Sequence, residues 1–186
     1  MNSFDRKKHY VKILAEDLNH NGFQYKEGLN VDTVPFNPVG SCSRGGLYFT
    51  TMQHMILYLN YGNKIADVEI PDDAEVYKDP SGNKWKADKI IIKNIREIKD
   101  LPQWQDENFC RDVMASYMDS YIVEALQVKS NVLKDLLIER YNDIRSDYVG
   151  YSKRIRDNNG KGWTSIALEE YKRRMKDLLS YIQLQN

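Results

Sequence analysis

Hydrophobic and polar positions follow two different periods along the chain, and the change falls at Asp100-Leu101-Pro102. Before this point the apolar runs are short and are separated by turn residues, which is typical of strands. After it, apolar residues return every three or four positions, which is typical of amphipathic helices. The pattern therefore predicts an α+β domain over residues 1–100, followed by an α-helical C-terminal extension over residues 101–186.

The first half is predicted to form a small mixed or antiparallel sheet with one main helix. Asn21-Gly22 is a hairpin turn signal, and two prolines predict an irregular loop over residues 30–40. Apolar residues at helical spacing predict a helix over residues 52–59, with Thr51 as its N-cap and Gly62 at its end. The expected strands cover residues 10–14, 23–25, 47–50, 65–70, 75–77 and 85–92.

The second half is predicted to contain about three helices with short connections, which favours a small bundle or hairpin. The first two cover residues 106–128 and 131–148, and a break follows at residues 157–162. Thr164 or Ser165 is expected to cap a last helix that runs to Ile182.

Charge is balanced over the whole chain, with 27 basic and 27 acidic residues among 186. This balance argues against duplex DNA or an anionic membrane as a dominant partner, so nucleic acid is not expected. The last part of the chain is locally basic. Solvation and packing are the favoured interpretation of these charges, and RNA binding is the alternative. The basic residues are Lys153, Arg154, Arg156, Lys172, Arg173, Arg174 and Lys176.

Cysteine and histidine usage favours an intracellular protein without a metal site. Cys42 and Cys110 do not form a disulfide framework, and a reduced thiol pair is the simpler interpretation. The three histidines lie far apart and lack zinc-ligand spacing, and the acidic stretch over residues 67–75 lacks the ligand order of an EF-hand. No apolar run is long enough for a signal peptide or a membrane span.

The glycine-rich stretch from Gly40 to Thr50 is the most informative local feature. Its glycines and serines predict a tight turn or a close backbone approach, directly before a strand. The loop over residues 41–46 is interpreted as a turn, and the alternative is an anion site that uses its N–H groups. If a ligand pocket lies here, we expect it to be contacted by Tyr25, Arg44, Tyr48, Thr50 and Glu69.

No catalytic constellation is recognisable. Cys42 would need His20 or His54 within hydrogen-bond reach to act as a nucleophile, and nothing in the sequence places them together. Phosphate-binding glycine motifs are also missing. We therefore expect no catalytic residues and no cofactor; a non-enzymatic role is favoured, and an enzyme is the alternative.

The region over residues 22–92 resembles an N-terminal module of proteins from giant DNA viruses of the mimivirus type, where it often precedes ankyrin or other helical repeats. The resemblance implies a viral protein made in the host cytoplasm, and it supplies no catalytic residues. No ankyrin repeat follows in this chain. The matching segments are Gly22-Phe23-Gln24-Tyr25, Gly28-Leu29-Asn30, Pro35-Phe36-Asn37-Pro38, Gly40-Ser41-Cys42-Ser43, Gly45 to Thr50, Tyr61-Gly62, Ile70-Pro71 and Trp85 to Ile91.

A second resemblance is to the ADP-ribosyltransferase fold. It rests on Gly46-Leu47-Tyr48-Phe49-Thr50, the helix after it, and Val68-Glu69-Ile70. It implies that Tyr48 stacks on nicotinamide and that Glu69 is a candidate acid. The sequence places neither the first-strand His or Arg of that fold nor its downstream Glu.

The leading hypothesis is a non-enzymatic protein-interaction module of a giant virus, with a protein partner, no membrane association and no predicted oligomeric state. Balanced charge, many tyrosines and the absence of catalytic motifs favour it. The alternative is a nucleotide-binding enzyme with an ADP-ribosyltransferase-like pocket near Tyr48.

Overall fold

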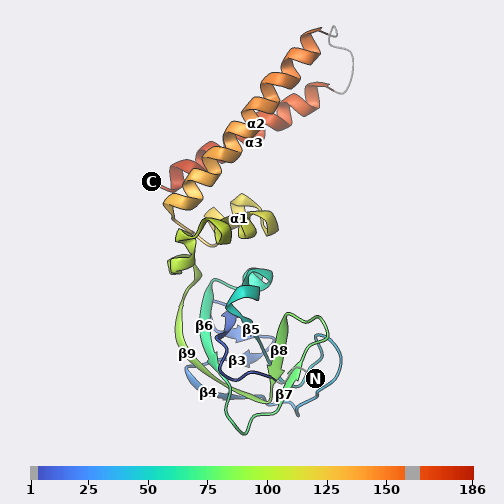
Figure 1. Ribbon diagram of the computed structural model, residues 1–186, viewed down its shortest axis with the longest axis vertical. Helices are drawn as coiled ribbons and strands as arrows, with labels where there is room; N and C mark the ends of the chain where they lie inside the picture. Colours follow the sequence, from blue (N-terminus) through green and yellow to red (C-terminus); the bar gives the residue numbers. More distant parts are fainter. Residues whose placement is uncertain (1–3, 158–163) are drawn as a thin grey trace. The chain divides into compact units, whose positions relative to one another are not determined.

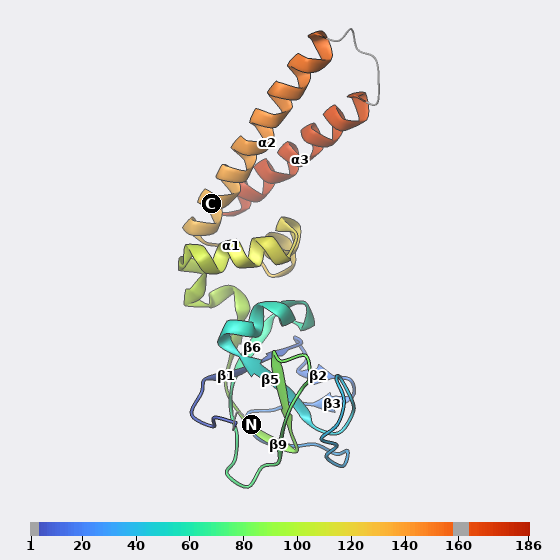
Figure 2. The same ribbon diagram turned by 45° about the vertical axis from the view of Figure 1, so that its right-hand side comes forward.

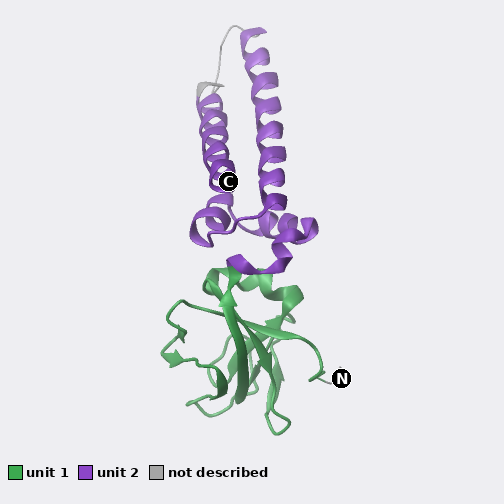
Figure 3. Cartoon of the chain, turned by 90° about the vertical axis from the view of Figure 1, so that its left-hand side faces the viewer, with its two compact units in different colours: residues 1–98 green, residues 99–186 purple. Residues whose placement is uncertain are grey.

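The computed structural model describes residues 4–157 and 164–186. It divides into two compact units, Met1–Ile98 and Lys99–Asn186 (Figure 3). The first unit holds every strand of the described chain, and the second holds the α-helices α1 to α3. The predicted fold class, an α+β part followed by an α-helical part, is confirmed.

The first unit is built on a seven-stranded sheet in which all neighbouring strands pair antiparallel (Figure 1). The strand order is β4-β9-β6-β1-β5-β8-β7, so β4 and β7 form the edges. The strands are β1 Tyr10–Leu14, β4 Gly28–Val31, β5 Leu47–Thr51, β6 Lys64–Glu69, β7 Val76–Lys78, β8 Lys84–Ala87 and β9 Lys89–Glu97.

The hairpin predicted at Asn21-Gly22 is confirmed. Strands β2 (Asn19–His20) and β3 (Phe23–Gln24) pair across this two-residue turn. Both turn residues have positive φ angles, 53° and 85°. This backbone matches the right-handed twist of a hairpin, and asparagine followed by glycine adopts it at low cost.

Strand β4 corrects the predicted loop over residues 30–40, because Gly28–Val31 pairs with β9. Its alternation is inverted: Leu29 and Val31 point to solvent, whereas Asn30 is buried. The Asn30 side chain donates to the carbonyls of Lys26 and Gly28, which satisfies its amide. A four-residue alternation is too short to stand out in the sequence, and the usual pattern would place Leu29 and Val31 inside instead of Asn30.

The strand predicted over residues 85–92 is two strands, β8 and β9, which separate at Asp88. The main chain of Asp88 accepts a hydrogen bond from Asp32, directly after β4, and donates one to Glu75, directly before β7. Both edge strands are therefore tied to the same corner, and the sheet curls around its core. The prediction was wrong because residues 85–92 contain no glycine or proline to mark the point where the chain changes its pairing partner.

The helix predicted over residues 52–59 is η1, a 3-10 helix over Met52–Tyr61 that packs on β1 and β5. Thr51 precedes it, but its side chain bonds the His54 ring instead of a backbone N–H, so the predicted N-cap bond is not formed. Gly62 ends the helix as predicted, and its N–H donates to the Leu59 carbonyl.

The core of the first unit is an aromatic and aliphatic cluster inside the curled sheet. Tyr10 lies at its centre, with ring centroids 5.2 Å from Phe49 and 5.5 Å from Trp85. The fully or nearly buried members are Tyr10, Leu14, Tyr25, Leu47, Phe49, Ala66, Val68, Ile70, Ala74, Ala87, Ile90 and Ile92. Aromatic edge-to-face contacts of this kind add specificity to the packing.

The helix predicted over residues 106–128 is shorter in the second unit. Helix α1 covers Glu107–Ser116, and Asp106 caps it by accepting from the Phe109 N–H. Tyr117 is extended, and a separate π-helical turn, η4, follows over Tyr121–Ala125. The Ser116 hydroxyl donates to the Asp112 carbonyl four residues earlier, and such bonds compete with helix continuation.

Helices α2 (Asn131–Asp157) and α3 (Thr164–Leu184) lie side by side as a hairpin (Figure 2). Helix α2 continues nine residues beyond the predicted end at 148, through Gly150. The predicted break ends α2 at Asp157, and residues 158–162 lie outside the described chain, as do the side chains of the predicted caps Thr164 and Ser165. Within the described ranges, no helix combines the length and apolar character that a membrane span needs.

Candidate functional site

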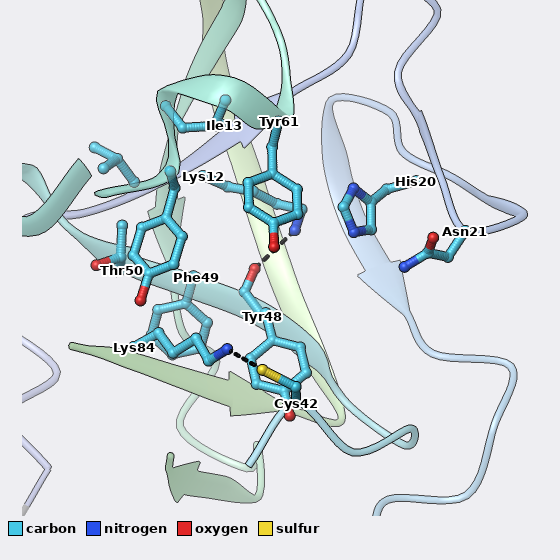
Figure 4. A pocket seen from close by; sticks show the side chains of 12 residues that line it. Lys12, Ile13, His20, Asn21, Cys42, Tyr48, Phe49, Thr50, Tyr61 and Lys84 are labelled. Atoms are coloured by element: carbon cyan, nitrogen blue, oxygen red, sulfur yellow. Dashed lines mark hydrogen bonds between the residues drawn. The ribbon is translucent and has the colours of Figure 1, made fainter. Parts of the chain in front are cut away.

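A cavity of about 180 Å³ opens in the first unit where strands β1 and β5 separate (Figure 4). The two strands pair only through Tyr10 with Thr51 and Val11 with Thr50. By contrast, β1 pairs with β6 along all five of its residues. The gap that follows Val11 is lined by side chains from β1, β5, η1, β8 and the β2–β3 turn.

Lys12 forms one wall of this cavity and is only 6% exposed. Its Nζ donates to the main-chain carbonyl of Tyr48 at 2.8 Å and lies 4.5 Å from the centroid of the Tyr25 ring. Burial lowers the pKa of Lys12 to about 7, because an ammonium group loses hydration inside the protein. Perturbed amines of this kind cluster at functional sites.

Lys84 and Cys42 lie beside the Tyr48 ring on another side of the cavity. Lys84 Nζ is 2.7 Å from the Cys42 sulfur and 3.8 Å from Asp79. The hydrogen bond from Lys84, together with one from Ser41, lowers the pKa of the exposed Cys42 thiol. This arrangement favours a thiolate at the cavity mouth.

Two aspartates hold the glycine-rich loop. Asp79 accepts hydrogen bonds from the Ser41 hydroxyl and the N–H groups of Cys42 and Ser81. Burial opposes its ionisation, but these hydrogen bonds outweigh that effect and lower the pKa of Asp79 well below its usual range. Asp32 accepts from the Gly46 N–H at 2.6 Å. The protein's own carboxylates therefore occupy the N–H groups of Cys42 and Gly46.

Tyr58 and Tyr61 from η1 and His20 and Asn21 from the β2–β3 turn complete the cavity. The His20 and Tyr61 rings lie 5.4 Å apart. Burial, and then the charge of Lys12, lowers the pKa of His20 and favours its neutral form. No aspartate or glutamate belongs to this described lining, so the cavity offers aromatic surface and hydrogen-bond donors, with Cys42 as its acidic group beside Lys84.

The five residues predicted from sequence do not all meet here. Tyr48 and Thr50 line the cavity, and Tyr25 lies against Lys12. Arg44 is exposed and does not belong to the described lining, and Glu69 is exposed and pairs with Lys93. The tyrosine, arginine and carboxylate of the predicted nucleotide pocket therefore do not converge in this cavity.

Sequence reasoning missed the two lysines and the η1 tyrosines. Lys12 carried a usable signal, since it is the one charged residue in the apolar strand Tyr10–Leu14 and strands buried on both faces rarely include lysine. Lys84, Tyr58 and Tyr61 carried none, because their positions look like ordinary surface residues until the strands and η1 are packed together.

Aspartates of the acidic stretch over residues 67–75 pair with basic side chains. Asp67 contacts His9 at 2.9 Å and Arg96 at 3.0 Å, and Asp73 contacts Lys89 at 2.6 Å. Within residues 4–157 and 164–186, no three side chains of the metal-ligating types come together.

Comparison with known proteins shows that the chain is similar to proteins of Acanthamoeba polyphaga mimivirus. It is 37% identical over 103 residues to "Uncharacterized protein R869", a match that covers 53% of this chain and 74% of that protein. The chain belongs to this mimivirus family. It is also 39% identical over 103 residues to "Putative ankyrin repeat protein R868" and 40% identical over 100 residues to "Putative ankyrin repeat protein L100".

Each of these matches covers about half of the chain. The two matches to ankyrin repeat proteins take up 53% and 50% of this chain, but 51% and 16% of those relatives. The chain therefore spans about half of the first relative's length and much less of the other. No protein-family model matches this chain, and no solved structure matches it.

Proposed function

We propose that this family member is a non-enzymatic protein-interaction module that acts in the host cytoplasm. One observation carries the proposal: matches of 84 to 103 residues make up 16%, 27%, 51% and 74% of four relatives. A segment that recurs in chains of such different length is a portable unit. Three of these relatives are named as ankyrin repeat proteins, and stacked repeats present extended binding surfaces.

A groove along the α2–α3 hairpin supports protein binding. Tyr141 on α2 and Met175 and Leu179 on α3 line it, and Leu179 is 44% exposed. Lys172 and Lys176 flank these apolar side chains. The complementary partner is an amphipathic helix that places an apolar stripe in the groove and acidic residues beside the two lysines.

The test uses one substitution in the groove and one outside it. Leu179→Asp puts a negative charge into the groove, and Val149→Asp makes the same change at an exposed α2 position outside the groove lining. The full-length variants are expressed with a tag in Acanthamoeba cells, and bound proteins are cross-linked and identified. We expect one partner to cross-link to α2–α3 in the wild type and in Val149→Asp, and to be lost in Leu179→Asp. Circular dichroism checks that both variants are folded.

Equal recovery of the same proteins by both variants would contradict the groove as the docking surface. The groove could also be occupied by a second copy of this chain. Light scattering on the purified chain tests this, because it measures whether the chain forms a dimer. If Leu179→Asp abolishes a dimer that the wild type and Val149→Asp both form, the groove mediates self-association instead of binding another protein.

The alternative, a nucleotide-binding enzyme, keeps one supporting observation: Tyr48 and Thr50 line the cavity. Thermal unfolding with and without NAD tests it, because a ligand at about 100 times its Kd stabilises the native state by about 2.7 kcal/mol. A shift in the unfolding midpoint that Tyr48→Ala abolishes would favour the enzyme and overturn the interaction module.

A further inference from the structure

We propose that the cavity between β1 and β5 binds a small organic anion, a carboxylate or phosphate carried on a flat ring, with Lys12 as its counter-charge. This inference concerns the first unit and is independent of the hairpin groove in the second. It also differs from the nucleotide hypothesis in ligand size and in the residues that hold the ligand.

Lys12 is a buried amine without a carboxylate partner in the described chain. Among the described residues, its contacts are to the neutral Tyr48 carbonyl and the Tyr25 ring, and none is to a carboxylate. An ammonium group has three N–H donors, so the Tyr48 carbonyl accounts for one of them. A buried charge is costly unless an opposite charge pairs with it. An anion in the cavity would supply that charge.

Other groups that line the cavity also favour a bound anion. Lys84, which also contacts Cys42 and Asp79, adds a second ammonium group, and the Tyr61 side chain lines the same cavity (Figure 4). The Asn21 amide and the neutral His20 ring each add a donor. No carboxylate lines the cavity, and the Cys42 thiolate at its mouth is paired with Lys84.

The size and surface of the cavity define the rest of the ligand. A cavity of about 150 Å³ holds benzene in another protein, and this one measures about 180 Å³. The space therefore suits one ring with an acid group, whereas a dinucleotide would have to extend beyond the cavity mouth. Tyr48, Tyr58, Tyr61 and Phe49 contribute aromatic surface against which a flat ring packs well.

Binding should be coupled to proton uptake. The titratable groups that line the cavity or pack against Lys12 are His20, Tyr25, Cys42, Tyr48, Tyr58, Tyr61 and Lys84. Of the two lysines, Lys12 is the one whose amine is partly neutral near pH 7. An anion favours the protonated amine, so affinity should fall as the pH rises above 7.

The experiment is isothermal titration of the full chain with 4-hydroxybenzoate and phenyl phosphate as ring acids, and with acetate and inorganic phosphate as anions without a ring. We expect a ring acid to bind at about pH 6 and to bind roughly tenfold or more weakly at about pH 9. The two ring acids distinguish carboxylate from phosphate as the preferred group. Titration in two buffers of different ionisation enthalpy should reveal net proton uptake.

Lys12→Met should abolish binding, whereas Lys78→Met, which removes an exposed lysine outside the cavity lining, should leave it unchanged. Absence of ring-acid binding to the folded wild type, or unchanged binding in Lys12→Met, would overturn the proposal. If Lys12→Met does not fold, the Lys12 side-chain NMR signal of the wild type decides. Its titration midpoint must move upward with ligand, and an unmoved midpoint overturns the proposal. Leu179→Asp changes the α2–α3 groove and not the cavity, so this variant should bind the anion normally. The two proposals can therefore fail independently.

Discussion

The Lys12 ammonium nitrogen lies 2.8 Å from the main-chain carbonyl oxygen of Tyr48, in the gap where strands β1 and β5 separate. If β1 and β5 continued to pair, a main-chain N–H of β1 would donate to a β5 carbonyl of this kind. Here a side chain takes the place of that backbone donor. The Lys12 side chain thus satisfies the Tyr48 carbonyl, and it also places a positive charge inside the protein.

Lys12 should make stability depend on pH. Its pKa is about 7 in the native protein against 10.5 for the ordinary side chain, so the unfolded chain binds more protons between these values. The free energy of unfolding should therefore rise with pH above 7, by at most about 1.4 kcal/mol per pH unit. Urea unfolding at several values between about pH 7 and about pH 9 measures this slope.

The matched variant for that measurement is Lys12→Met, which has a similar length and no charge. Its unfolding free energy should change less with pH than that of the wild type over the same range. Parallel curves for the two proteins would show that Lys12 is not the group responsible.

The two cysteines should differ in reactivity. Cys42 is exposed and its pKa is lowered by Lys84, whereas burial raises the pKa of Cys110 to about 11. Because the thiolate is the reactive form, iodoacetamide should modify Cys42 at least about tenfold faster than Cys110 in the native protein. Peptide mass spectrometry over a time course measures both rates.

Lys84→Met should slow the modification of Cys42 about threefold or more, because it removes the hydrogen bond that stabilises the thiolate. Lys78→Met is the control and should have no effect. An unchanged Cys42 rate in Lys84→Met would rule out the lysine as the cause.

Two glycine-to-alanine substitutions should change stability in opposite directions. A Cβ at Gly62 would lie 2.0 Å from the Leu14 carbonyl oxygen, so the backbone must shift. We expect a loss of about 1–3 kcal/mol. A Cβ at Gly150 in α2 would meet nothing within 4 Å, and alanine should add about 1 kcal/mol through helix propensity. Urea unfolding of both variants provides the comparison, and equal effects would contradict the close approach at Gly62.

The division of the chain into residues 1–100 and 101–186 remains a prediction about folding. We expect each part, expressed alone, to unfold cooperatively with a smaller urea slope than the whole chain, since the slope follows the surface exposed on unfolding. Circular dichroism and urea unfolding of the two fragments test this. A fragment of residues 1–100 without a cooperative transition would mean that the first unit needs the second.

Sequence reasoning identified those elements whose signals are local. Strand β1 and the Asn21-Gly22 hairpin were correctly placed, because apolar strand composition and turn chemistry depend on adjacent residues. Strand β4 was missed because its buried residue is Asn30, which becomes acceptable inside only through hydrogen bonds to Lys26 and Gly28. The turn at Asp88 was missed because its partners, Asp32 and Glu75, come from distant parts of the chain.

By itself, the sequence determined the change from strands to helices near residue 100, the α+β class and the resemblance to mimivirus proteins. These properties depend on periodicity and on short motifs. Only the tertiary structure decided that Lys12, Lys84 and Tyr61 line one cavity, and that Glu69 lies outside it. The physical reason is that a cavity forms where strand pairing stops, and pairing is decided by the packing of the whole sheet rather than by neighbouring residues.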